Sequence, residues 1–201
     1  MPTTSIIGLL CSIVCFASYT WAIVALFNKP DGQPMKMKLV SGMGFIFFLA
    51  QLVAIVRGKP LVWLAILGIC FYGIAFVLFW WAVTAVRGAG LNVAFTTTQP
   101  SKLLIYGPYR YIRHPFYASY LAFWIAGVMV SSEPLLLPCV VCMGLLYTLA
   151  MKQEEREFRQ GPLREAYHDY ALVTGKVLPR VIYKSRQLSV FILTGLFFVR
   201  F

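Results

Sequence analysis

The chain is poor in charged residues, and acidic residues are the scarcest of them. Only 12% of its 201 residues are charged and seven are acidic, whereas 60% are hydrophobic. Soluble domains carry about 25% charged residues, so this composition excludes an ordinary soluble enzyme. Because the apolar residues gather in long uncharged runs, the chain is predicted to be an integral membrane protein.

The sequence also lacks several motifs of common catalytic sites. It contains no phosphate-binding P-loop, no GxSxG nucleophile motif and no HExxH zinc motif. No histidine or acidic residue lies in the apolar stretches that hold the five cysteines, so we interpret these as small buried residues and expect no metal site. These cysteines are Cys11, Cys15, Cys70, Cys139 and Cys142.

The apolar runs predict an all-α, polytopic fold with about five transmembrane helices. About 20 residues cross the hydrocarbon, and a shorter pair of runs separated by a polar break predicts a C-terminal helical hairpin. The runs cover residues 5–27, 39–56, 61–86, 117–130 and 135–151. A last apolar stretch, residues 188–199, is too short to span comfortably and is predicted to lie at the interface.

We divide the chain into residues 1–86, with three transmembrane helices, and residues 87–201, with a polar loop, the hairpin and a basic tail. If the N-terminus lies outside, the outer loops hold only Arg57 and Lys59, and the other basic residues lie inside. The positive-inside rule therefore places the polar loop and the tail in the cytoplasm. With a net charge of +11, the expected partner is an anionic leaflet rather than nucleic acid.

Residues 107–117, with the sequence GPYRYIRHPFY, concentrate aromatic, cationic and imidazole groups directly before the fourth apolar run. Ionisable side chains near hydrocarbon are costly, which makes them candidates for function. The alternative is a juxtamembrane belt, in which arginine snorkels and tyrosine anchors at the headgroups.

Acidic residues cluster after the fifth run. Glu154 shares one helical face with Tyr147, Met151 and Phe158. The hairpin would bring this carboxylate close to residues 107–117, although the two lie about forty residues apart.

Two other titratable groups have simpler interpretations. Glu155 has Arg159 four residues further on, which favours a surface ion pair. His168, between Tyr167 and Asp169, is more simply a solvated side chain than a general base.

The residues alone thus predict a pocket with Tyr109, His114 and Tyr117 on one wall and Glu154 on the other. Aromatic rings stack on a purine or a cation, and a carboxylate accepts hydrogen bonds from ribose hydroxyls or an ammonium group. These properties indicate a nucleoside-type cofactor site at the cytoplasmic membrane surface, open to a lipophilic substrate.

The run GPYRYIRHPFYASY, the apolar hairpin and the following EEREF, GPLREAYHDY and GKVLPR segments resemble the isoprenylcysteine carboxyl methyltransferase family. Its relatives include bacterial membrane methyltransferases and phospholipid N-methyltransferases. The resemblance covers about residues 87–182 and makes residues 87–201 methyltransferase-like. It implies a multi-pass enzyme, expected in a bacterial inner membrane, that uses S-adenosylmethionine in a cytoplasmic pocket. Its acceptor would be a lipophilic or small carboxylate, thiol or amine.

The resemblance also implies roles for individual residues. The catalytic set carried over is His114, Arg113 and Glu154, with Arg113 steering an anionic group. The cofactor-binding set, which includes part of the upstream segment 101–104, is Lys102, Leu103, Leu104, Tyr109, His114, Pro115, Tyr117, Glu154 and Glu155.

The chain departs from the family pattern at three positions. Phe158 replaces a leucine, and Ser119 stands where glycine is common. Ala150 replaces an arginine that helps to hold the substrate in the prenylcysteine enzymes, so the identity of the acceptor does not carry over.

Two alternatives stay open at this stage. The first is an NADPH-dependent, sterol-type membrane reductase, for which Arg110 and Arg113 could serve a 2′-phosphate. Phe116 argues against it, because those enzymes usually have asparagine there. The second is a non-catalytic membrane protein that has kept the fold.

Overall fold

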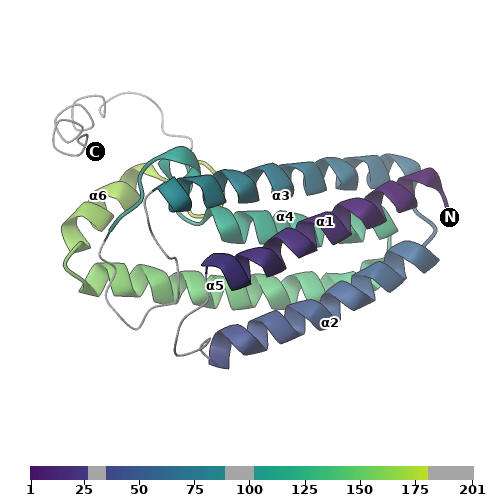
Figure 1. Cartoon of the computed structure of the whole chain (residues 1–201), viewed down its shortest axis with the longest axis horizontal. Coiled ribbons are helices and arrows are strands. Elements are labelled where there is room, and N and C mark those ends of the chain that lie inside the picture. The colour runs from purple at the N-terminus through teal and green to yellow at the C-terminus, as the bar shows by residue number, and fades with distance from the viewer. Residues whose placement is uncertain (27–34, 89–101, 181–201) are drawn as a thin grey trace.

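The computed structural model describes residues 1–26, 35–88 and 102–180. Five long helices lie side by side along the longest axis of the molecule (Figure 1). They are α1 (Thr3–Leu26), α2 (Met35–Arg57), α3 (Val62–Gly88), α4 (Pro115–Ser131) and α5 (Leu137–Gln160). Short helices η1 (Gly107–Arg110), η2 (Pro134–Leu136) and α6 (Arg164–Val173) complete the described structure. The predicted interfacial segment, 188–199, lies outside the described residues.

The predicted all-α membrane fold is confirmed. Helices α1, α2 and α3, and the η2–α5 unit, are long and apolar enough to cross a membrane. Helix α4 has 17 residues, at the lower end of the length that spans the hydrocarbon. Within the described residues, the five predicted transmembrane runs fall on these helices, and many apolar side chains on their outer faces are exposed, as expected of a polytopic membrane protein.

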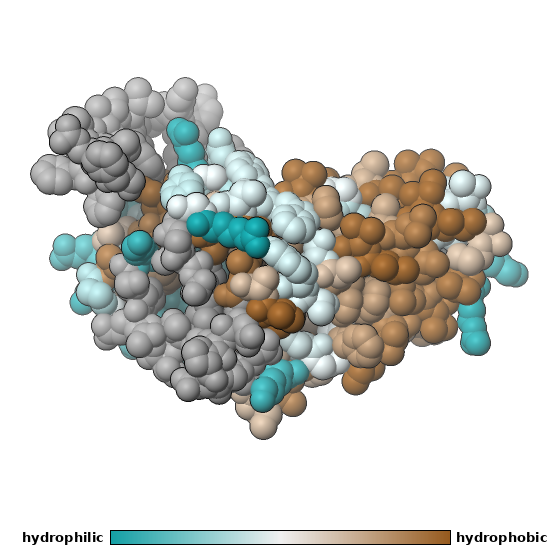
Figure 2. All heavy atoms as spheres, viewed as in Figure 1, coloured by the Kyte–Doolittle hydropathy of each residue, from teal (hydrophilic) through white to brown (hydrophobic). Residues whose placement is uncertain are grey.

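The two ends of the bundle differ in polarity. Apolar residues dominate the end near the N-terminus, whereas hydrophilic residues gather around α6 (Figure 2). At the N-terminal end the α2–α3 turn meets the α4–α5 turn, where the Leu61 amide donates to Ser132 Oγ at 2.9 Å. Arg57 and Lys59 lie at this end, and α6 lies at the opposite end with residues 107–114 (Figure 1).

Helices α3 and α4 pack closely because Gly68 has no side chain. A Cβ atom at this position would lie 2.9 Å from the main-chain oxygen of Ala126. Ser119 on α4 donates to the Ala75 carbonyl of α3 at 2.9 Å and contacts the hydroxyl of Tyr19 at 3.0 Å. Helices α1, α3 and α4 therefore share one core, and the division of the chain at residue 86 stays a prediction.

A polar side chain also links the helices inside the bundle. Gln51 on α2 is 1% exposed, and its Nε2 donates to Ser12 Oγ at 2.9 Å and to the Tyr72 hydroxyl at 3.0 Å. Lipid tails are as apolar as the helix surfaces, so the hydrophobic effect does not drive transmembrane helices together. Interhelical hydrogen bonds of this kind help to hold them together instead. The amide thus joins α1, α2 and α3.

The cysteines follow the prediction only in part. Cys15 is buried, but Cys11, Cys139 and Cys142 are half-buried and Cys70 is exposed. The interpretation of all five as buried residues was therefore wrong, because lipid-facing positions of a bundle also accept small apolar side chains.

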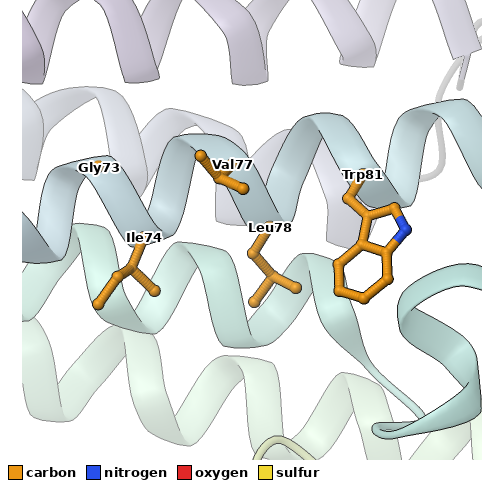
Figure 3. A pocket seen from close by; sticks show the side chains of 5 residues that line it. All are labelled: Gly73, Ile74, Val77, Leu78 and Trp81. Atoms are coloured by element: carbon orange, nitrogen blue, oxygen red, sulfur yellow. The ribbon is translucent and has the colours of Figure 1, made fainter.

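The outer face of α3 carries an apolar hollow. It is lined by Gly73, Ile74, Val77, Leu78 and Trp81 (Figure 3). Because all five residues belong to one helix, the hollow is a groove in the lipid-facing surface.

Replacing Gly68 with alanine is expected to destabilise the fold by about 1–3 kcal/mol, since the added methyl group meets the main-chain oxygen of Ala126, which cannot turn aside. Thermal unfolding in detergent measures this effect. The matched control is Gly73→Ala in the same helix, where a Cβ would have nothing within 4 Å. Equal melting temperatures for the two variants would contradict the close α3–α4 packing.

Candidate functional site

The functional candidates lie where the chain enters α4. Pro115 occupies the first turn of α4 and His114 is the residue that precedes the helix, an arrangement that suits proline because the first helical N–H groups have no partner. Gly107, with φ of 60°, begins η1 in a left-handed conformation that favours glycine. A Cβ at this position would lie 3.1 Å from that of Ala85. The turn therefore needs glycine, and it fixes the approach of the chain to His114.

The segment after α6, residues 174–176, runs beside residues 111–114, and we call it the strap. The amide of Arg113 donates to the Gly175 carbonyl at 2.8 Å, and the amide of His114 donates to the Lys176 carbonyl at 3.0 Å. In return the Gly175 amide donates to the Tyr111 carbonyl at 3.1 Å. Two segments about sixty residues apart thus fix each other's main chain.

Glu155 on α5 is the centre of the charged network. Its side chain is 7% exposed, and its Oε1 lies 3.3 Å from Arg113 Nε and 3.2 Å from His114 Nε2. Its Oε2 lies 3.2 Å from Lys176 Nζ and 3.4 Å from Arg159 Nη2. Every carboxylate oxygen therefore has two cationic partners, which is the pairing that a buried charge requires.

Glu154 has a different environment. Tyr117 donates its hydroxyl hydrogen to Glu154 Oε1 at 2.6 Å, and His114 Nδ1 lies 3.5 Å from Oε2. The side chain is 33% exposed. This carboxylate is anchored on one side and retains accepting capacity on the other.

Aromatic rings surround these groups. The rings of His114 and Tyr117 lie 5.8 Å apart, and Tyr117, Tyr120 and Tyr147 contact one another with centroids 5.6–6.2 Å apart. Burial raises the pKa of the Tyr109 hydroxyl, and the nearby charge of Glu154 raises it further. The tyrosines therefore offer neutral rings beside a carboxylate.

His114 lies between the two carboxylates. Burial alone would lower the pKa of its imidazole, but hydrogen bonds and charge from Glu154 and Glu155 outweigh burial and raise this pKa above its ordinary value of 6.5. The arrangement favours the imidazolium form, in which both ring nitrogens donate.

The raised pKa of His114 makes stability depend on pH. A raised folded-state pKa contributes stability that is fully present below pH 6.5 and is lost as the pH rises through the folded-state value. We expect the stability advantage of the wild type over His114→Gln to shrink as the pH rises from 6 to about 9. Melting temperatures of both proteins across this range test it, and parallel curves would contradict the ion pairs.

The predicted approach of His114 and Glu154 is confirmed by their 3.5 Å contact. The surface interpretation of Glu155 was wrong, because this side chain is buried although it does contact Arg159. The buried face of α5 is made by Met143, Tyr147, Met151 and Glu155. This series advances four residues at a time, so the second glutamate continues the buried face and Glu154 flanks it.

Arg113 has partners that the sequence did not indicate. Its guanidinium is 14% exposed, and Nη1 donates to the carbonyls of Ala171 at 3.0 Å and Thr174 at 2.5 Å, at the end of α6. Because Nε also donates to Glu155, most N–H groups of this guanidinium already have acceptors within the protein. This geometry gives little support to the expected steering of an anion by Arg113, or to a part for Arg113 in the 2′-phosphate site of the reductase alternative.

The remaining predicted residues lie around this centre. Pro115 is buried, Leu103 and Tyr109 are half-buried, and Leu104 packs against the bundle core. Lys102 is exposed. Residue 101, the start of the predicted upstream segment, lies outside the described residues, and the cofactor-binding role of residues 102–104 stays a prediction.

Sequence reasoning missed the contributions of the tail. Lys176 binds Glu155, and Tyr170 donates its hydroxyl hydrogen to the Tyr109 carbonyl at 2.7 Å. Tyr167 stacks on Phe158 with centroids 4.9 Å apart. One signal was available: the four-residue spacing that ends at Glu155 predicts its burial, and a buried carboxylate requires cations.

His168 is exposed, as its solvated interpretation predicts.

Comparison with known proteins adds an independent finding. A model of the phospholipid methyltransferase family matches residues 63–168, which include His114, Glu154 and Glu155. No curated protein and no solved structure matches the chain. The sequence-based resemblance named phospholipid methyltransferases as relatives, and this part of it is confirmed. Because the match covers more than half of the chain, the protein belongs to the phospholipid methyltransferase family and is a membrane methyltransferase.

Proposed function

We propose that the protein transfers a methyl group from S-adenosylmethionine to an acceptor at the cytoplasmic surface of the membrane. The observation that carries this proposal is the environment of Glu154. Its carboxylate is one-third exposed and lies beside Tyr117 and the buried His114, at the polar end of the α4–α5 hairpin. The uneven distribution of basic residues supports the cytoplasmic side.

The residues present fit S-adenosylmethionine. Glu154 has lone pairs left for ribose hydroxyls or an ammonium group. The lone pairs of Glu155, by contrast, are already engaged by four basic side chains. The faces of Tyr109 and Tyr117 suit adenine or a sulfonium cation, since aromatic rings attract cations. We therefore assign Glu154, Tyr117, Tyr109 and His114 to the cofactor.

The cofactor supplies a methyl group on a positively charged sulfur. The protein has to hold the reactants in line and exclude water, which is the usual contribution in such displacements. His114 and Tyr117 fix the direction of the Glu154 carboxylate, and the rings of Tyr120 and Tyr147 pack against that of Tyr117. An amine or thiol acceptor needs a base, whereas a carboxylate acceptor needs none.

The acceptor is proposed to be lipophilic. The apolar part of the η2–α5 unit is long enough to cross the membrane, and the helix ends in the polar residues around Glu154. An acceptor anchored in the membrane would therefore reach the site from the adjoining leaflet. The position of Ala150, where prenylcysteine enzymes have an arginine, removes one reason to propose a prenylated substrate.

The proposal is tested by titrating the purified protein with S-adenosylmethionine and with NADPH while its thermal unfolding is followed. A ligand that binds only the folded state raises the melting temperature. We expect S-adenosylmethionine alone to do so. Transfer of a labelled methyl group to lipid extracts, and to small amines, thiols and carboxylates, then identifies the acceptor. Stabilisation by NADPH alone, with no labelled product, would overturn the assignment.

A further inference from the structure

Lys176 contacts the site through both its main chain and its side chain. Its carbonyl accepts the His114 amide at 3.0 Å, and its ammonium lies 3.2 Å from Glu155 Oε2. The strap thereby joins two elements that the chain does not connect locally, the entry to α4 and the polar end of α5. The sequence and the family comparison assign no role to this residue.

The two oxygens of Glu155 have unequal partners. Oε1 contacts Arg113 and His114, which are 14% and 8% exposed. Oε2 contacts Lys176, which is 35% exposed, and Arg159, which is 65% exposed. Without the ammonium, Oε2 would retain only the solvated Arg159, and exposed pairs of this kind hold a geometry weakly. The Glu155 carboxylate would then be held firmly through Oε1 alone, and its orientation toward His114 would be less well fixed.

The main-chain hydrogen bonds of the strap also help to hold His114 in place. Thr174–Lys176 lie beyond the end of α6, and their hydrogen bonds to residues 111–114 fix the residues immediately before the helix. The Lys176–Glu155 pair ties this strap to α5. Loss of the pair would loosen the strap and, with it, the main chain of His114.

We propose that Lys176 is a positioning residue for the cofactor site. It holds Glu155 so that Oε1 stays on the imidazole of His114, and it holds the strap so that the main chain of His114 stays in place. The imidazole is thereby kept against Glu154, where the cofactor is proposed to bind. This inference rests on the proposed function.

The test compares Lys176→Met with Lys176→Arg, which keeps the charge. The matched control is Arg180→Met, because Arg180 is an exposed cation just beyond the strap that donates to the Leu172 carbonyl at 2.7 Å. Hydrogen exchange of the peptide covering residues 107–117 reports on the amides of Arg113 and His114. Equilibrium binding of S-adenosylmethionine reports on the site.

Lys176→Met is expected to speed exchange in this peptide about fivefold and to weaken cofactor binding about fivefold, the scale of a half-exposed ion pair. Lys176→Arg is expected to restore both, and Arg180→Met to change neither. Exchange in a peptide from α3 should stay constant, which excludes global unfolding. If Lys176→Met does not fold, the arginine variant and the milder Lys176→Gln are compared in its place.

If residues 107–117 of Lys176→Met exchange their amide hydrogens at the wild-type rate, the proposal is overturned. Faster exchange with unchanged cofactor affinity would also overturn it, because the strap would then hold the chain without positioning the site. If the wild type binds no S-adenosylmethionine, the proposed function fails. The exchange measurement then decides by itself whether Lys176 holds His114.

Discussion

Replacing Glu155 with alanine is expected to lower the free energy of unfolding by about 3–5 kcal/mol, the cost of breaking a buried ion pair by removing one partner. The substitution leaves the buried Arg113 without its carboxylate and His114 with Glu154 alone, and it frees the ammonium of Lys176. Since a single domain is stable by only about 5–15 kcal/mol, the variant should unfold at a far lower temperature or accumulate poorly.

Denaturant or thermal unfolding of both proteins in the same detergent measures this loss. Glu157→Ala is the matched control, since Glu157 lies on the same helix and, among the described residues, accepts a side-chain hydrogen bond from the exposed amide of Gln153 at 3.2 Å. The control should lose no more than about 0.5 kcal/mol. A Glu155 variant as stable as this control would show that the cation network does not hold the fold.

The second large effect is expected from Glu154→Gln. The substitution keeps the shape of the side chain and an oxygen that accepts from Tyr117, but it removes the negative charge. Hydrogen bonds to a charged group are worth about 1.5–3 kcal/mol. We therefore expect S-adenosylmethionine to bind about ten- to a hundredfold more weakly, with methyl transfer falling at least as much.

Equilibrium binding and initial rates with the same acceptor give the two quantities, and Glu157→Gln serves as the control for a charge lost elsewhere on α5. Without cofactor, the melting temperature of Glu154→Gln should fall only slightly, because the amide oxygen still accepts from Tyr117 and the lost charge pair with His114 is partly exposed. Full cofactor affinity and full turnover in this variant would remove Glu154 from the site.

The two variants separate two adjacent glutamates that the sequence presents as a pair. Loss of Glu155 is expected to act on the fold, through cations buried around it. Loss of Glu154 is expected to act on the ligand, through a carboxylate that stays accessible. Because the two expected effects differ, a substitution of one glutamate does not report on the role of the other.

The helices could be predicted from the sequence because hydrocarbon thickness imposes a length and an apolar composition on each span. The meeting of His114 with Glu154 was also predictable, since a hairpin returns α5 to the start of α4. Both features depend on local pattern and on one simple topology.

The strap could not be predicted in the same way. Its pairing of Gly175 with Ile112 is a single parallel bridge with no repeating pattern. The contacts of Arg113 with the last carbonyls of α6 depend on how that helix is placed, which no spacing in the sequence encodes. The burial of Glu155 stood between these cases, because the spacing indicated it but the nearby Arg159 offered a simpler interpretation.

The alternative of a juxtamembrane belt is compatible with the exposed tyrosines beside the candidate site. Tyr106 and Tyr111 are 45% and 50% exposed, as expected for aromatic anchors at the membrane surface. His114 is 8% exposed and is bound by two carboxylates. Exposed tyrosines, which fit the belt, and a buried, paired histidine, which does not, thus lie close together in the sequence.

The most direct measurement of the central claim is an experimental structure of the protein with S-adenosylhomocysteine bound. The account predicts the nucleoside between α4 and α5, with Glu154 within hydrogen-bonding distance of it and Glu155 still surrounded by Arg113, His114 and Lys176. A nucleoside bound elsewhere, with the His114–Glu154 contact untouched, would contradict it.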